Sequence, residues 1–153
     1  PPKELLCKLS LGFCPTPKTI VFSAVDIDRI IDRSGVGQGP GTNQIGMLHN
    51  AVEPNIPRPN MVKYRIVVEA ASKYSLRVFY ASAEERPVSI SVNDTQVATD
   101  ALRATTGGWN NEHRAWSQPQ DITLIAGENT LLLRRTNVFP HLSKFELREA
   151  RGE

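Results

Sequence analysis

Apolar and polar residues alternate along several short stretches of this chain. In residues 61–69 the apolar side chains fall on one side and the charged ones on the other, a period of two that is typical of a half-buried β-strand. The other expected strands are residues 20–24, 74–80, 88–92, 96–102, 122–125, 131–135 and a C-terminal strand that carries Phe145 and Leu147 inward. No long stretch has apolar residues at helical spacing. The pattern predicts an all-β fold, an antiparallel β-sandwich or jelly roll of about eight strands.

Turn-forming residues separate the expected strands. The short segment 70–72 predicts a hairpin between strands 61–69 and 74–80, Asn93-Asp94 predicts a turn, and Gly127 can adopt the positive φ of a tight reversal. Residues 26–60 interrupt this rhythm and include a run rich in Gly, Pro and Asn. An irregular stretch of that length inside a domain is typical of a functional loop.

The length of 153 residues predicts one domain. Residues 1–19 hold four of the eleven prolines and both cysteines, so we expect them to form an N-terminal extension or linker, followed by the sandwich domain at 20–153. Cys7 and Cys14 either close a short disulfide loop or remain free thiols, and the sequence leaves both alternatives open.

The charge balance argues against nucleic acid as a partner. The chain has 18 Lys and Arg against 16 Asp and Glu, so its overall field is weak. Its apolar stretches are only a handful of residues long, whereas a membrane span needs about 20. We therefore expect neither a nucleic acid nor a membrane partner.

The residues that catalysis would need are scattered. The three histidines, His49, His113 and His141, lie far apart, and no Gly-x-Ser-x-Gly motif accompanies them. The glycine-rich run 35–39 lacks the Gly-Lys-Ser/Thr ending of a phosphate loop. Carboxylates such as Glu84 are numerous enough for glycoside hydrolysis, but a solvated turn explains residues 84–86 better. We expect a domain that binds a ligand and is not an enzyme.

A tryptophan in a polar loop is the most informative feature. Residues 105–111 place Trp109 among small and polar neighbours, which predicts an exposed indole. A flat indole face attracts the C–H face of a sugar, while nearby amides bond its hydroxyl groups. The alternative is that Trp109 folds back as a lid on the core. Trp116 is expected to be a core residue.

The order of several short motifs resembles that of the non-catalytic carbohydrate-binding modules of families six and thirty-five. The motifs are Ser34-Gly35, Gly46-Met47, the strands 62–68 and 74–81, Val92-Asn93-Asp94, Thr106-Gly107-Gly108-Trp109 with Trp116, residues 126–130 and residues 140–147. The resemblance covers residues 20–149. It implies a galactose-binding-like jelly roll, usually attached to secreted polysaccharide-degrading enzymes or to cell-surface proteins.

The resemblance also implies a binding cleft at the loops of one end of the sandwich. Trp109 corresponds to its aromatic platform, Met47 to the residue of the opposite wall, and His141 to a polar residue of the last loop. Asn137 is a second candidate for the hydrogen-bonding role, and Asn111 is a further polar contact. Met47 is not aromatic and cannot stack as a ring does, so the opposite wall departs from the family pattern.

Many of these modules hold a structural calcium ion with acidic side chains. The matching positions here are Ser23, Val25 and Ser143, none of which is a carboxylate. Calcium prefers six to eight oxygen ligands, so losing charged ligands lowers its affinity. Asp26 and Asp28 are the only acidic substitutes nearby, and we expect no cofactor and a calcium site that is weak or empty.

Together these observations predict a secreted or extracellular carbohydrate-binding module. Its partner would be an oligo- or polysaccharide, and the Pro-rich extension favours the interpretation that the domain is part of a larger multidomain protein. The alternative is a structural or protein-interaction module on the same fold, in which the sugar cleft has degenerated. Loop shapes set specificity, so the sequence does not name the glycan.

Overall fold

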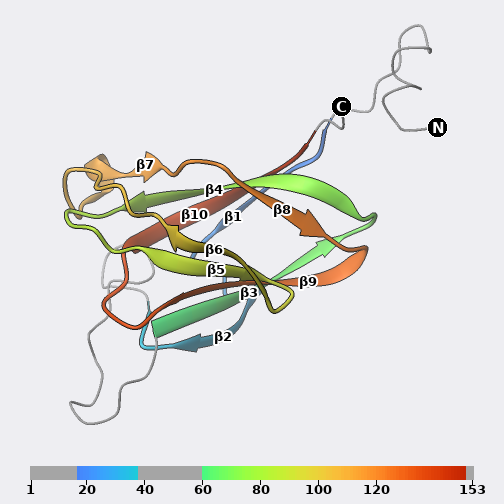
Figure 1. The fold of residues 1–153 in the computed structure, drawn as a ribbon, viewed down its shortest axis with the longest axis horizontal. Coiled ribbons are helices and arrows are strands. Elements are labelled where there is room, and N and C mark those ends of the chain that lie inside the picture. Colours follow the sequence, from blue (N-terminus) through green and yellow to red (C-terminus); the bar gives the residue numbers. More distant parts are fainter. Residues whose placement is uncertain (1–16, 38–59, 151–153) are drawn as a thin grey trace, which may run out of the picture.

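The predicted β-sandwich is confirmed in the computed structural model, which describes residues 17–37 and 60–150. Two antiparallel sheets of five strands each form the two layers (Figure 1). The strands are β1 (Thr19–Ser23), β2 (Ile30–Ser34), β3 (Asn60–Val68), β4 (Ser72–Ala81), β5 (Val88–Val92), β6 (Thr95–Ala101), β7 (Ala115–Trp116), β8 (Gln120–Leu124), β9 (Gly127–Arg135) and β10 (His141–Glu149), with a short 3-10 helix η1 (Asn111–His113). The first sheet has the order β1-β10-β4-β7, with β8 also paired to β4, and the second has the order β2-β3-β9-β5-β6.

The inward faces of the two sheets form one apolar core. Alternate residues of β3 and β4 are buried, as the period of two requires. At its centre the Tyr64 and Phe145 rings lie 4.8 Å apart between centroids, and the Phe22 and Phe145 rings 5.0 Å apart. The Tyr64 hydroxyl donates to the Ala24 carbonyl at 2.7 Å, and burial raises the pKa of this phenol far above its usual value.

The predicted hairpin between residues 61–69 and 74–80 is wrong. Strand β3 pairs with β2 and β9 in the second sheet, whereas β4 pairs with β10, β7 and β8 in the first. The short connection between them therefore crosses from one layer to the other. A period of two shows which side chains point inward, but it does not identify the hydrogen-bonded neighbour.

Strand β2 was not predicted, because it lies in the stretch that interrupts the rhythm. It is an edge strand whose residues are half-buried or exposed, so it lacks an apolar alternation. It pairs with β3 through Arg33 and Val62. The expected turns are present: Asn93 and Asp94 have φ of 49° and 65°, and Gly127 has φ of 92°.

Several sequence predictions fall on residues that are not described. Cys7, Cys14, Met47 and His49 lie outside the described residues, and so does most of the expected extension at 1–19. The domain boundary at residue 19 remains a prediction. In the described ranges no helix is long and apolar enough to cross a membrane.

Candidate functional site

Three loops meet at one end of the sandwich. The connections β4–β5, β6–β7 and β9–β10 lie together on the left of Figure 1. Trp109 belongs to the β6–β7 connection, and His141 is the first residue of β10. The fold therefore brings together residues that are far apart in the sequence.

The β6–β7 connection is anchored to the end of β4. The Thr106 amide donates to the Ser82 carbonyl at 2.8 Å, and the Ser82 amide donates to Thr106 Oγ1 at 2.8 Å. The Tyr80 hydroxyl also donates to the Ala104 carbonyl. These bonds fix the loop in front of Trp109, so that the position of the indole is set by the sandwich itself.

The two glycines before Trp109 are required by different constraints. Gly107 has φ of 95°, a conformation that side chains disfavour. A Cβ atom on Gly108 would lie 2.4 Å from His113 Nδ1, which is much too close. The Gly-Gly pair therefore lets the chain turn sharply while His113 packs against it.

Trp109 is half-buried and contacts two neighbouring side chains. The Arg86 guanidinium lies 3.9 Å from the centre of the indole, a cation–π contact. The His141 ring lies 4.8 Å from it between centroids, tilted by 38°. The indole is thus neither fully open, as one sequence interpretation required, nor enclosed in the core, as the other did.

Arg86 was missed by sequence reasoning, which placed residues 84–86 in a solvated turn. Its side chain is only 13% exposed. Its Nη1 donates to the Phe139 carbonyl at 2.8 Å, and its Nε and Nη2 donate to Glu84 Oε1 at 2.8 and 2.6 Å. Glu84 is a local partner, but Phe139 and Trp109 lie far from Arg86 in the sequence, so no local pattern predicts the contact with the indole.

His141 is buried beside the indole, with 6% of its surface exposed. Its Nδ1 lies 3.0 Å from the Trp109 carbonyl and therefore donates to it. Burial lowers the pKa of His141, and the positive charge of Arg86 lowers it further, against an opposing effect of the bond to Trp109. The ring is therefore neutral at pH 7 and serves to hold the Trp109 loop.

This environment predicts that acid weakens the domain through His141. Because the pKa is lower in the folded state, its contribution to stability is complete above the ordinary value of about 6.5 and is lost as the pH falls below it. When the pH is lowered from 7.5 to 5, the melting temperature of His141→Asn should therefore fall less than that of the wild type. Asparagine keeps a hydrogen-bond donor but does not titrate. Scanning calorimetry at both pH values measures this, and an identical fall in both proteins would contradict it.

The two asparagines of the candidate site are exposed on neighbouring loops. Asn111 begins η1, and its Oδ1 accepts from Arg114 Nη2 at 2.5 Å. Asn137 lies in the β9–β10 connection, where its Oδ1 accepts from the Val138 amide at 2.7 Å. Both amides can reach solvent, so they remain candidates for bonding a ligand at this end.

Comparison with known proteins identifies the family. Residues 20–139 match the family model Endotoxin_C, delta endotoxin. The chain belongs to the delta endotoxin family. No curated protein matches the sequence of this delta endotoxin domain.

Solved structures of carbohydrate-binding modules share the fold of the delta endotoxin domain. A family 35 module from Clostridium thermocellum has a TM-score of 0.63 at 15% identity, over 85% of this chain and 97% of that one. The C-terminal family 6 module of LamC, a marine laminarinase from Zobellia galactanivorans, has a TM-score of 0.61 at 16% identity, over 86% and 99%. A GH26-CBM35 β-(1,4)-mannanase from Podospora anserina has a TM-score of 0.62 at 14% identity, over 88% of this chain but only 28% of its own.

These similarities confirm the resemblance to families six and thirty-five as a likeness of fold. The identities are low, so the likeness shows the galactose-binding-like sandwich. Sequence reasoning found this fold but not the delta endotoxin family, whose model matches.

The residues that the sequence matched to a calcium position make hydrogen bonds within this delta endotoxin domain. The Ser23 hydroxyl accepts from the Val25 amide at 3.2 Å, and the Ser143 carbonyl accepts from the Ala24 amide at 2.8 Å. The Asp26 carboxylate accepts from the Asp28 amide at 3.1 Å and lies 3.5 Å from Arg29 Nε. The oxygens at this position thus accept hydrogen bonds from backbone amides, and the Arg29 guanidinium lies beside the Asp26 carboxylate. Calcium needs six to eight oxygen ligands, so this arrangement does not fit the ion.

We accordingly predict that calcium neither binds tightly nor stabilises the domain. A ligand that binds the folded state raises its melting temperature, so added calcium should leave the melting temperature unchanged. Calorimetric titration of calcium into the chelator-treated protein measures the affinity. Tight binding with a raised melting temperature would contradict this account.

Trp116 is not the core residue that the sequence predicted. It is half-buried on the outward side of the first sheet, where β7 pairs Trp116 with Phe79. The two rings lie 4.9 Å apart between centroids. Because alternate residues of β4 point inward, Phe79 and its partner must point outward.

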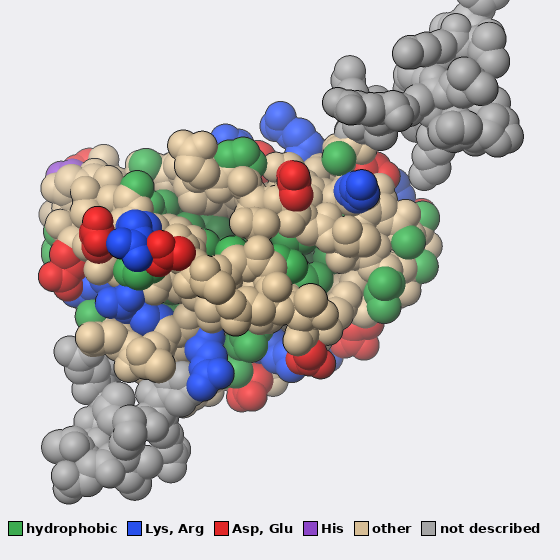
Figure 2. Space-filling model, viewed as in Figure 1, with side chains coloured by type: hydrophobic (Ala, Val, Ile, Leu, Met, Phe, Trp, Pro, Cys, Tyr) green, Lys and Arg blue, Asp and Glu red, His purple; other side chains and the backbone are tan. Residues whose placement is uncertain are grey.

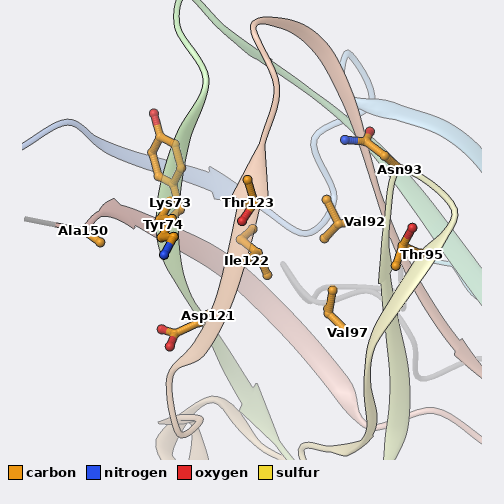
Figure 3. A pocket seen from close by; sticks show the side chains of 10 residues that line it. All are labelled: Lys73, Tyr74, Val92, Asn93, Thr95, Val97, Asp121, Ile122, Thr123 and Ala150. Atoms are coloured by element: carbon orange, nitrogen blue, oxygen red, sulfur yellow. The ribbon is translucent and has the colours of Figure 1, made fainter. Parts of the chain in front are cut away.

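Two cavities open between the sheets, away from Trp109. One, of about 540 Å³, has Val92, Val97 and Ile122 in its middle with Thr95 and Thr123 beside them (Figure 3). The other, of about 480 Å³, is lined by β6 and by the segment 116–120. Figure 2 shows apolar side chains in the middle of this face of the molecule. Neither Trp109 nor His141 is among the described residues that line these two cavities. The candidate site is therefore not one of the cavities but the surface formed by the loops.

Proposed function

We propose that this delta endotoxin domain is a non-catalytic carbohydrate-binding module whose sugar lies against Trp109 at the loop end. The observation that carries the proposal is the position of the indole, which Arg86 and His141 hold at that end. A side chain that is already fixed loses little entropy when a ligand binds. The fold, shared with solved carbohydrate-binding modules, supports the same function.

In this proposal the accessible part of the indole covers the apolar face of one sugar ring. Asn111 and Asn137 are exposed on the two adjoining loops and offer amide groups to the hydroxyls. His141 does not contact the sugar but orients Trp109 through its carbonyl. Met47, outside the described residues, remains the proposed residue of the opposite wall. Polysaccharides accessible to such a module lie outside cells, which favours an extracellular location.

We propose no reaction at this end of the sandwich. Glycoside hydrolysis needs one carboxylic acid and one free carboxylate facing each other across the bond. Glu84 is held by two hydrogen bonds from Arg86, and His141 donates to a backbone carbonyl. Both groups have structural roles that keep the loops together.

Replacing Trp109 with alanine should weaken glycan binding by about 10- to 100-fold. Burying an aromatic side chain contributes about 1.5 to 3 kcal/mol, and the substitution removes that contribution. A glycan array first identifies a ligand of the wild-type domain, and calorimetric titration then measures its affinity. The matched control is Ile125→Ala, a 55% exposed residue of the β8–β9 turn, which should keep wild-type affinity.

Because Trp109 also contacts Arg86, its loss should cost about 1 to 2 kcal/mol of stability. Affinity is therefore measured at a temperature at which circular dichroism shows the variant to be folded. A folded variant with undiminished affinity would refute the proposed site. Absence of binding to any glycan by the wild type would instead favour the protein-interaction function.

A further inference from the structure

The outward side of the first sheet carries a group of aromatic and basic side chains. Phe79 and Arg77 lie on β4, Lys144 on β10 and Trp116 on β7, and we call these four residues the aromatic–basic patch. The strand register places Trp116, Phe79 and Lys144 in one row across three neighbouring strands. The patch is therefore built on hydrogen-bonded strands and not on loops.

The basic groups of the patch lie over its two rings. Lys144 Nζ is 5.0 Å from the centre of the Phe79 ring and 5.4 Å from that of the Trp116 ring. The Arg77 guanidinium is 4.5 Å from the centre of the Trp116 ring. All four residues are half-buried, so that rings and cations both retain surface that solvent reaches.

The positive charge of the patch is only partly neutralised. Arg77 donates to Glu146 Oε1 at 2.8 and 3.1 Å, which satisfies that guanidinium. Lys144 makes no ion pair with any residue in the described ranges and contacts the two rings instead. Its ammonium group is therefore available to an anion from solution.

The outward side of the second sheet differs. There Lys63 lies 3.7 Å from Asp94 and Arg65 lies 2.6 Å from Glu128, so these two cations have carboxylate partners. The exposed Arg134 is paired in register with Met61 and Ser89, neither of which is aromatic. In the register of that sheet, Arg65 pairs with Thr130 and Lys63 with Leu132, neither of which is aromatic. The combination of stacked rings with an unpaired cation thus distinguishes the first sheet.

We propose that the aromatic–basic patch binds an acidic carbohydrate, one that carries carboxylate or sulfate groups. The rings offer apolar surface to the C–H face of a sugar, and Lys144 offers a charged donor to its anionic group. A neutral sugar would leave this ammonium unused, and a small inorganic anion would leave the rings unused. The patch shares no residue with the loop-end site at Trp109 and lies on the outward side of the sheet, so this proposal does not depend on the first.

Tryptophan fluorescence can observe each site by itself, because the chain has two tryptophans. In Trp109→Phe the emission comes from Trp116 alone, and in Trp116→Phe from Trp109 alone. We expect an oligogalacturonate or a sulfated oligosaccharide to change the emission of Trp109→Phe, and a neutral oligogalactose of the same length to leave it unchanged. Comparing the two acidic probes decides between carboxylate and sulfate.

The charge is tested by Lys144→Gln, which keeps a polar, unbranched aliphatic stem and removes the ammonium. Affinity for the acidic probe should fall by about tenfold or more, because a hydrogen bond to a charged group is lost. The matched control is Lys63→Gln, which lowers the net charge equally and should keep wild-type affinity. Raising NaCl from about 50 to about 500 mM should weaken binding to the wild type.

Three results would overturn the proposal. One is equal affinity in Lys144→Gln and Lys63→Gln, which would mean a general charge effect. Another is loss of acidic-probe binding, measured calorimetrically, in folded Trp109→Ala, which would place that sugar at the loop end. The third is binding to vesicles of anionic phospholipid, but to neither acidic probe, which would make the patch a lipid-binding surface. Failure of the neutral-glycan experiment on Trp109 affects none of these results.

Discussion

Replacing Asn129 with alanine should lower the free energy of unfolding by about 3 to 4 kcal/mol. Asn129 is completely buried at the start of β9. Its side-chain amide joins the β8–β9 turn to the β5–β6 turn. Its Oδ1 accepts from the Ile125 amide at 2.9 Å and from Asn93 Nδ2 at 2.9 Å, while its Nδ2 donates to the Ile125 carbonyl at 2.9 Å. Truncation leaves these partly buried groups of Asn93 and Ile125 without their partner, and an unsatisfied buried group costs about 1 to 3 kcal/mol.

Asn93 extends this network into the β5–β6 turn. The backbone amide of Asn93 donates to the Thr130 carbonyl at 3.0 Å, and the side-chain Oδ1 of Asn93 accepts from the backbone amide of Thr130 at 2.9 Å. Urea denaturation measures the loss, with Gln96→Ala as the control, since Gln96 is an exposed amide on the neighbouring strand β6. If Asn129→Ala lowered the free energy of unfolding by less than about 1 kcal/mol, the whole network would stabilise the fold no more than one ordinary hydrogen bond, which would contradict the prediction.

Phe145→Ala should cost about 3 to 5 kcal/mol, because it removes the ring at the centre of the core. Phe145 is completely buried on β10 and lies against the rings of Phe22 and Tyr64. These neighbours come from β1 and β3, in different sheets, so the cavity would weaken the contact between the two layers.

Urea denaturation also measures this effect. The matched control is Val67→Ala on the outward side of β3, where 63% of the side chain is exposed, and it should change stability by less than about 0.5 kcal/mol. If Phe145→Ala were no more destabilising than Val67→Ala, the packing of the two sheets around this ring would be wrong.

Alternation along the chain was enough to predict the sandwich and the inward side of each long strand. Tyr64 and Phe145 were placed inward correctly because each strand has one apolar face. The same pattern misassigned the partner of β3 and missed β2, since pairing between strands depends on contacts between distant residues. Trp116 was misplaced because a large apolar side chain on an outward position is indistinguishable from a core residue by type alone.

The candidate site could be predicted only in part. Trp109 was proposed from its small and polar neighbours, a local signal, and His141 from the order of motifs. The structure brings the two residues into contact, while their roles in binding stay a prediction. Arg86 was missed, although it covers the indole, because its partners Phe139 and Trp109 are brought to it by the fold. Because Arg86 lies over the indole, Trp109 is half-buried. It is therefore neither the open platform nor the lid on the core that the two sequence interpretations offered.

The most direct test of carbohydrate recognition at the loop end is an NMR titration of the labelled domain with a glycan that it binds. We expect the backbone amides of residues 105–113 and 136–141, together with the Trp109 indole N–H, to shift along one saturating curve. The amides of the β8–β9 turn, at the opposite end, should remain unchanged. Saturable shifts confined to other parts of the sandwich, with the Trp109 indole unaffected, would contradict the proposed site.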